Sequence, residues 1–144
     1  MARVEIIIEV PSVEETVEWY KRVLGWRGSF DVFDSDNNCL FGEVYTFTPS
    51  SEKPEAKIGF DLARSEKSSR NSPNWQALIY VDDVEQVLRR VLDSGWQVET
   101  GIGAQPWGAR TFNMLDLNGV RLRFAQMTEH LNMEEIQKRI DDSR

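Results

Sequence analysis

Few side chains in this sequence have the chemistry of a nucleophile or of a transition-metal ligand. The chain contains one cysteine, Cys39, and one histidine, His130. No nucleophile motif surrounds His130, and no histidine lies near Cys39 in the sequence to activate its thiol. We therefore expect Cys39 to be a buried, unreactive strand residue, and we assign no catalytic residue.

Two further patterns suggest chemistry but have simpler explanations. Glu5 and Glu9 lie on one face of an expected strand and could act as an acid–base pair. Such carboxylates are more often solvated or paired with cations. The stretch Gly101–Ala104 contains two glycines, yet it matches neither phosphate-binding loop pattern, so we expect a strand connection there.

Aromatic side chains are better candidates for contact with a ligand. Trp107 lies between Pro106 and Gly108, two residues with the chemistry of a turn rather than of a strand. A turn in this position would leave the indole free to cover a ligand. We therefore predict Trp107 to be a mobile residue over a binding cleft.

Two expected strands place aromatic rings beside polar groups. Alternation puts Tyr45 on the same face as Glu43, and Tyr80 on the same face as Gln76. Phe112 is a further candidate for aromatic surface. Acidic groups beside aromatic rings suit flat, cationic molecules through charge pairing and cation–π contact.

The candidates are positioned by a structural unit that occurs in two copies. The stretch Val10–Glu14 is similar to Val81–Glu85, at an offset of 81 − 10 = 71 residues. Each copy follows an apolar run and precedes an amphipathic stretch that ends at Gly25 or Gly95. A repeat of this length indicates one supersecondary unit copied within a domain, so we expect the copies to pack as a pseudo-twofold pair.

The first copy predicts a strand, a helix and three strands. A strand over residues 4–10 ends at Pro11, and Ser12 with Glu15 has the pattern of a capping box. The helix that follows has a stripe of apolar residues and stops at Gly25, which supplies a left-handed conformation. The predicted strands cover residues 26–33, 39–48 and 58–63.

The second copy predicts the same order. A strand over residues 75–81 precedes a helix capped by Asp83, and strands follow over residues 96–100, 110–115 and 120–125. The predicted buried stripe of the helix consists of Val84, Val87, Leu88, Val91 and Leu92. The fold class is therefore α+β, with two βαβββ modules and a C-terminal helix capped by Asn132 and Glu135.

The length of 144 residues is that of a single domain. Within a domain of residues 1–127, we place module one at residues 1–63, a polar linker at 64–73 and module two at 74–127. The linker has serines and charges of both signs but no apolar residue. Residues 128–144 form a helical extension.

Composition excludes several classes of partner. The net charge of −7 and the pI near 4.8 argue against nucleic acid and against anionic membranes. No apolar stretch approaches the roughly 20 residues of a bilayer span, and the N-terminus lacks a signal-peptide pattern. A single cysteine excludes an internal disulfide and fits the cytoplasm.

Several motifs together resemble the vicinal oxygen chelate superfamily, which contains glyoxalase I, extradiol dioxygenases, and fosfomycin and bleomycin resistance proteins. The matching stretches are Val10–Trp26, Tyr80–Val84, Gln105–Gly108 and Asp116–Gly119, and the resemblance covers residues 4–126. It implies two βαβββ modules that form a curved mixed sheet around a cleft, commonly within a homodimer.

The resemblance also implies where a metal would bind. Members that use a metal place four ligands on the first and last strands of the modules, and the matching positions here are Glu5, Asp61, Gln76 and Arg123. A guanidinium has only donors and stays protonated, so Arg123 cannot ligate a metal and would repel a dication. We therefore expect neither a metal nor another cofactor. The alternative is a buried polar network without a ligand.

These expectations predict a metal-free binding protein for a small molecule, such as an aromatic or cationic antibiotic that is sequestered. The predicted ligand-binding residues are Glu5, Tyr45, Asp61, Gln76, Tyr80, Trp107, Phe112 and Arg123. A first alternative is a metal-dependent lyase, isomerase or dioxygenase related to glyoxalase. A second alternative is a sensory module that binds a ligand and serves a transcription regulator.

Overall fold

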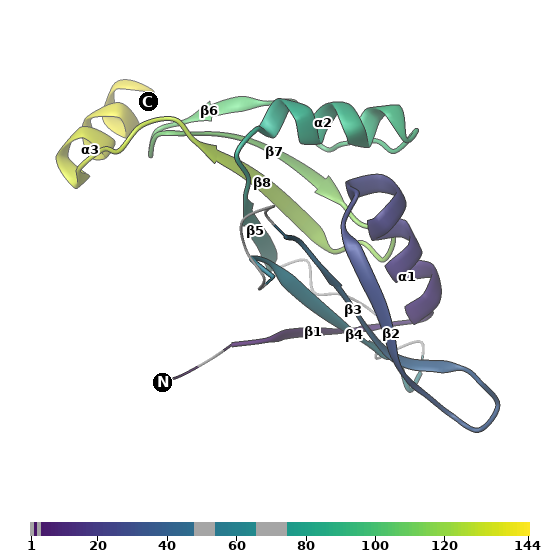
Figure 1. The fold of residues 1–144 in the computed structure, drawn as a ribbon. Coiled ribbons are helices and arrows are strands. Elements are labelled where there is room, and N and C mark those ends of the chain that lie inside the picture. The colour runs from purple at the N-terminus through teal and green to yellow at the C-terminus, as the bar shows by residue number, and fades with distance from the viewer. Residues whose placement is uncertain (1, 3, 48–53, 66–74) are drawn as a thin grey trace. The chain divides into compact units, whose positions relative to one another are not determined.

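The structure is a computed structural model that describes residues 2, 4–47, 54–65 and 75–144. The chain divides into two compact units, residues 1–72 and residues 73–144. Each unit has the order strand, helix and three strands, and each contains one four-stranded mixed sheet (Figure 1). The α+β class and the duplicated module predicted from the repeat are thus confirmed.

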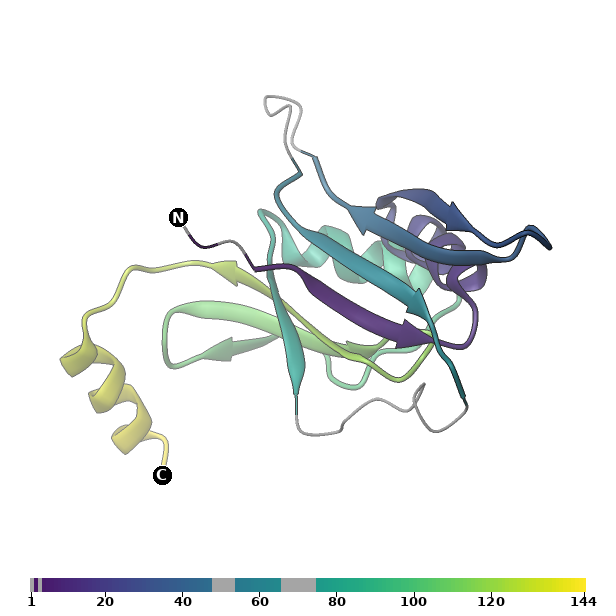
Figure 2. The ribbon, with the colours of Figure 1, turned by 90° about the horizontal axis from the view of Figure 1, so that it is seen from below.

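The sheet of unit 1 is built around β4. Its strands are β1 (Ile6–Val10), β2 (Arg27–Phe33), β3 (Cys39–Tyr45) and β4 (Lys57–Leu62), in the spatial order β1-β4-β3-β2. β1 runs parallel to β4, as Figure 2 shows, and the other pairs are antiparallel. Each of residues 58–61 of β4 therefore has one neighbour on β1 and one on β3, on the same face of the sheet.

The helix of unit 1 begins and ends where the sequence predicts. Helix α1 (Val13–Trp19) begins after Ser12, whose side-chain oxygen accepts a hydrogen bond from the backbone N–H of Glu15 at 3.2 Å. A π-helical turn, η1 (Tyr20–Leu24), continues it to Gly25, where φ is 72°. Only glycine adopts this conformation readily, so Gly25 ends the helix.

An aromatic cluster fills the core between α1 and the sheet of unit 1. Tyr20 is fully buried, and its ring lies 4.9 Å from that of Trp19, 5.6 Å from that of Trp26 and 5.3 Å from that of Phe60. Edge-to-face and tilted arrangements of this kind stabilise a core beyond the area that they bury. The helix is thereby fixed to one face of the sheet, and Lys57 and Asp61, which alternate with the buried Phe60 along β4, lie on the opposite face.

Cys39 is expected to react with a thiol reagent only when unit 1 opens. Its side chain is 3% exposed, and burial raises the pKa of the thiol, so the reactive thiolate is rare at neutral pH. Labelling with a chromogenic disulfide should be slow in buffer and complete within seconds in 6–8 M urea, roughly the concentration that unfolds most domains. Rapid labelling of the folded protein would contradict this.

The sheet of unit 2 has the same topology as that of unit 1. Its strands are β5 (Gln76–Tyr80), β6 (Gly103–Gln105), β7 (Ala109–Leu115) and β8 (Arg121–Met127), in the order β5-β8-β7-β6. Helix α2 (Val84–Asp93) packs against β7 and β8. Its N-terminus is capped by Asp83, whose carboxylate accepts from the backbone N–H of Gln86, as the sequence predicts.

Three predictions for unit 2 are wrong. Residues 96–100 do not form a strand, because their polar groups bond irregularly: the indole of Trp96 donates to the carbonyl of Leu115, and the N–H groups of Glu99 and Thr100 share the carbonyl of Asn113. The edge strand β6 follows instead, in the stretch predicted to be a connection. Leu92, expected in the buried stripe of α2, is 51% exposed.

Helix α3 (Met133–Asp142) ends the chain and, in Figure 1, projects beyond the end of β8. Asn132 caps it by accepting from the backbone N–H of Glu135 at 2.9 Å, as predicted. None of its residues is buried, and Met133 is 76% exposed. Within the part of the chain that the structure describes, no helix has the length and apolar character of a membrane span.

Candidate functional site

The most distinctive group of polar side chains in unit 2 lies on the sheet face away from the core. Arg123 on β8 pairs directly with Asn113 on β7, and Thr111 lies two residues before Asn113, on the same face. Gln105 on β6 lies on this face too, because it pairs with Ala109, which is two residues before Thr111 on β7. We call these four residues, Gln105, Thr111, Asn113 and Arg123, the Arg123 cluster.

Hydrogen bonds link part of the Arg123 cluster. The amide of Gln105 donates to the Thr111 hydroxyl oxygen at 2.9 Å, and Nη2 of Arg123 lies 3.5 Å from the same oxygen. In contrast, Nε of Arg123 and Oδ1 of Asn113 are buried and have no hydrogen-bond partner among the described residues. Buried polar atoms without a partner are rare and costly, so they indicate a function or a missing ligand.

The neighbouring arginine has a partner. Nε and Nη2 of Arg121 donate to the two carboxylate oxygens of Glu99 at 2.9 and 3.1 Å. This paired geometry lowers the pKa of Glu99 and raises that of Arg121. The charge of Arg121 is therefore compensated locally, whereas no ion pair of Arg123 is found within the described residues of unit 2.

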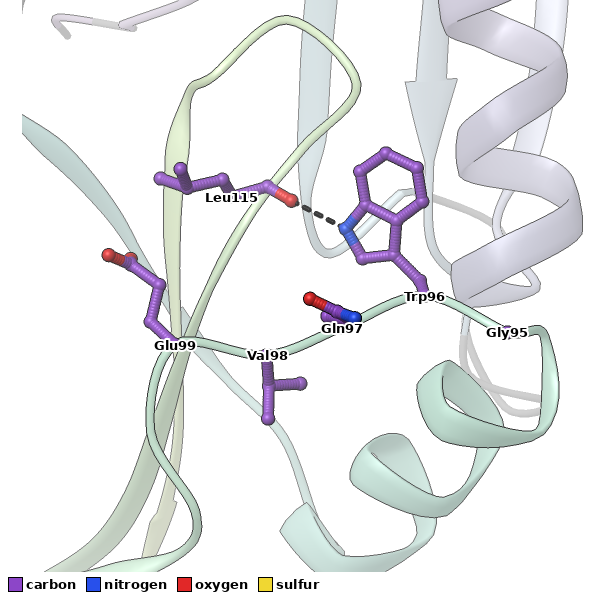
Figure 3. A pocket seen from close by; sticks show the side chains of 6 residues that line it. All are labelled: Gly95, Trp96, Gln97, Val98, Glu99 and Leu115. Carbon is purple, nitrogen blue, oxygen red and sulfur yellow. Dashed lines mark hydrogen bonds between the residues drawn. The ribbon is translucent and has the colours of Figure 1, made fainter.

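Glu99 also lines a pocket of unit 2 that has a volume of about 450 Å³. Gly95, Trp96, Gln97, Val98, Glu99 and Leu115 line it, and Figure 3 shows the Trp96 indole bonded to the carbonyl of Leu115 at 2.8 Å. The Trp96 indole N–H and the Glu99 carboxylate already have hydrogen-bond partners. A ligand in this pocket would therefore gain mainly apolar contacts from these two side chains.

The aromatic residues predicted to contact a ligand fall in different environments. Tyr80 is 62% exposed and lines a pocket of about 250 Å³ with Val81, Asp82, Gln126 and Met127. Tyr45 is half-buried, with its ring 5.4 Å from that of Phe47. Phe112 is fully buried and stacks on Phe124 in the core, so it does not line the face that carries Arg123.

Trp107 lies in the turn that joins β6 to β7. The turn is closed by the N–H of Gly108, which donates to the carbonyl of Gln105 at 3.1 Å. The Gly108 carbonyl in turn accepts from the N–H groups of Thr128 and Glu129. The turn is thus attached to the chain beyond β8, and the lid role predicted for Trp107 stays a prediction.

Unit 1 places Glu5 and Tyr45 near a lysine. Lys57 lies 3.4 Å from a carboxylate oxygen of Glu5 and 3.5 Å from one of Glu43. The guanidinium of Arg27 lies 5.0 Å from the centre of the Phe47 ring, a cation–π contact. The two carboxylates therefore already have a cationic partner within unit 1, and Phe47, the aromatic neighbour of Tyr45, contacts a second cation.

The strand registers change one assignment made from the sequence. Leu78 pairs with Arg123 in unit 2, and its counterpart in unit 1 is Ile7, since 78 − 7 = 71. Ile7 pairs with Gly59, so Gly59 rather than Asp61 occupies the position equivalent to Arg123. Asp61 lies two residues further along the same face, opposite Glu9.

The residues at these positions do not fit a divalent metal. The corrected set is Glu5, Gly59, Gln76 and Arg123, of which glycine has no ligand atom and arginine only donors. A Cβ added at Gly59 would lie 3.0 Å from the Phe41 ring, so an aromatic side chain covers that position. Among the described residues, no three His, Cys, Asp or Glu side chains form a metal-binding group.

Arg123→Met is expected to increase the free energy of unfolding by about 1 kcal/mol, because it removes a buried donor that has no partner. If Arg123 were kept for structure, its substitution would lower the stability of the protein. If it is kept for binding, its substitution can raise the stability of the protein. Urea denaturation of the two proteins measures the difference. A loss of more than about 1 kcal/mol would favour the purely structural network.

Sequence reasoning missed Thr111, Asn113 and Lys57. The signal for the first two was present: Thr111 and Asn113 alternate with the apolar residues Phe112 and Met114, which predicts polar residues on one face of β7 and core residues on the other. The role of Lys57 depends on the register of β1 with β4, which sequence alone does not supply.

Comparisons with known proteins agree with this architecture. A model of the Glyoxalase/Bleomycin resistance protein/Dioxygenase superfamily matches residues 3–124. Among curated proteins, none matches the chain.

Several solved structures share the fold. One, of a glyoxalase-related enzyme from Clostridium phytofermentans, has 19% identity and a TM-score of 0.69, with 88% of this chain and 95% of the other covered. TioX from Micromonospora sp. ML1 has 15% identity and a TM-score of 0.64, with 91% of this chain and 100% of TioX covered. A glyoxalase/bleomycin resistance protein/dioxygenase from Nocardioides has 14% identity and a TM-score of 0.64, with 92% of this chain and 89% of the other covered.

Proposed function

Because the chain belongs to the Glyoxalase/Bleomycin resistance protein/Dioxygenase superfamily, we propose that it is a member that binds a small organic molecule without a metal. The observation that carries the proposal is the presence of Arg123 at a position where the family resemblance implies a metal ligand. A fixed positive charge at this position opposes a dication and can instead hold a ligand.

Unit 1 supports the proposal independently of Arg123. Its one carboxylate at a family-equivalent position, Glu5, pairs with the ammonium group of Lys57 at 3.4 Å. A metal would have to displace this lysine, and Gly59 beside it offers no further ligand. The donor set is therefore poor in both units, and each contributes a cation where a metal site needs carboxylates or imidazoles.

The role that follows is binding without chemical change. A protein of the bleomycin-resistance type protects by sequestering its ligand, so it needs a site with a few convergent polar groups and apolar walls. The Arg123 cluster supplies polar groups of this kind, and the exposed side chains of Leu78 and Tyr80 supply apolar surface on the same face. We infer that the ligand occupies this face of unit 2.

Metal content tests the proposal. The purified protein is incubated with Ni²⁺, Zn²⁺, Fe²⁺ or Mn²⁺, desalted and measured by elemental mass spectrometry. We expect far less metal than protein under every condition. A matched variant, Lys57→Gln, frees Glu5 from its ion pair and shows whether the lysine contributes to exclusion. Stoichiometric metal on the unmodified protein would refute the proposal and favour the metal-dependent lyase or dioxygenase.

A further inference from the structure

Two buried atoms without partners lie on residues that are paired across β7 and β8. They are Nε of Arg123, which can only donate a hydrogen bond, and Oδ1 of Asn113, which can only accept one. A ligand that satisfies both must present an acceptor to the arginine and a donor to the asparagine. The backbone of Asn113 is held in place, because its N–H donates to the Thr100 hydroxyl at 3.0 Å.

The charge balance of unit 2 decides which acceptor is preferred. Its ion pairs among the described residues are Glu85–Arg110, Glu99–Arg121 and Glu129–Arg139. Arg123 takes part in none of these pairs, so its positive charge is left for a partner from outside unit 2. A guanidinium presents parallel N–H groups that match the two oxygens of a carboxylate, and such charge-assisted bonds are the strongest available here.

The side chains beside Arg123 define the rest of the ligand. Oδ1 of Asn113 requires a hydroxyl or amino group close to the carboxylate. The Thr111 oxygen accepts from Gln105 and lies near Arg123, so its own hydrogen is available for a ligand oxygen. On the other side of Arg123, its directly paired neighbour on β5 is Leu78, which is 43% exposed and offers apolar contact.

We propose that the Arg123 cluster binds the carboxylate of a small organic acid that has a hydroxyl or amino group next to the carboxylate and an apolar body. The proposal rests on the proposed metal-free binding function and names its ligand class. It replaces the cationic ligand expected from the sequence, because the acidic residues that suggested a cation are paired with Lys57 in unit 1.

Nuclear magnetic resonance can test this assignment with simple acids. The probes are mandelate, which has a carboxylate, an adjacent hydroxyl and an aromatic body, its neutral amide mandelamide, and phenylacetate, which lacks the hydroxyl. The Nε–Hε signal of Arg123 is assigned from its loss in Arg123→Lys. We expect mandelate to shift this signal, phenylacetate to bind roughly 3–10-fold more weakly, and mandelamide to bind at least about 10-fold more weakly.

A matched pair of variants separates specific binding from general attraction of anions. Asn113→Asp places a carboxylate on the residue paired with Arg123, so an internal ion pair should weaken mandelate binding by about 10-fold or more. Arg121→Gln removes a charge of the same sign from β8, but that charge is already compensated by Glu99, so binding should change by less than about threefold. This pattern would support the assignment.

Other results would overturn it. If neither acid shifts the Arg123 signal, or if mandelate binds Asn113→Asp as tightly as the unmodified protein, the cluster is not a carboxylate site. If Arg121→Gln and Asn113→Asp lose the same amount of mandelate affinity, the binding reflects nonspecific attraction of anions, and the assignment of a carboxylate site is overturned. These outcomes leave metal-free binding of some other ligand intact, whereas only stoichiometric metal refutes the proposed function itself.

Discussion

Replacing Phe112 by alanine is expected to lower the free energy of unfolding by about 3–5 kcal/mol. The side chain is fully buried, and its ring stacks on Phe124 with centroids 5.2 Å apart and planes inclined by 22°. Removing it leaves a cavity between α2 and the sheet, because α2 packs on the same two strands, β7 and β8, that carry these rings. Urea denaturation followed by tryptophan fluorescence measures the loss.

Tyr80→Ala is the matched control for this prediction. Tyr80 is an aromatic strand residue of the same unit, but it is 62% exposed, so its removal should cost less than about 1 kcal/mol. The comparison also tests the ligand role predicted for Phe112 from the sequence. If Phe112→Ala were as stable as Tyr80→Ala and yet bound ligand more weakly, the ring would belong to a binding site rather than to the core.

The fold was largely predictable because local signals and the internal repeat agree. Pro11, the cap at Ser12 and the left-handed Gly25 determine where the first helix begins and ends, and the 71-residue offset transfers the same order to the second unit. The edge strand of unit 2 was not predictable in this way. Its position depends on how Trp96 and the backbone of Glu99 bond to β7, which is a tertiary effect.

The candidate site was predictable only in part. Arg123 follows from the family resemblance, which matches its position on β8, but its counterpart in unit 1 could not be placed, since the loop before β4 has no landmark in the sequence. Only the pairing of Ile7 with Gly59 shows that a glycine occupies the position assigned to Asp61. Phe112 was misplaced for a different reason: its ring suggested a ligand contact, whereas the alternation of β7 indicates the core.

Gly108→Ala is expected to lower the free energy of unfolding by about 2–5 kcal/mol, which combines a backbone cost and a steric cost. The φ angle of Gly108 is 91°, a region that residues with a side chain rarely adopt. A Cβ at this position would also lie 2.7 Å from the backbone oxygen of Glu129. Because this oxygen is a backbone atom, it can move away only if the segment beyond β8 moves with it.

Two glycines of the same unit allow these costs to be separated. Gly119 has a φ of 80° but open space around a Cβ, so Gly119→Ala should show the backbone cost alone, about 1–2 kcal/mol. A Cβ at Gly103 also meets nothing within 4 Å, and Gly103 is not among the residues with positive φ, so Gly103→Ala should change stability by less than about 0.5 kcal/mol. Urea denaturation of all three variants gives the ordering.

The ordering bears on function because Gly108 connects the turn of Trp107 to Thr128 and Glu129 through its carbonyl group. If Gly108→Ala is the least stable of the three, the turn is held rigidly and Trp107 is presented to a ligand in a fixed position, which would contradict the mobility predicted for Trp107 from the sequence. In that case ligand binding by Gly108→Ala should weaken even in protein that remains folded. If Gly108→Ala is no less stable than Gly119→Ala, the segment yields to the new side chain, and a rigid turn at Trp107 is contradicted.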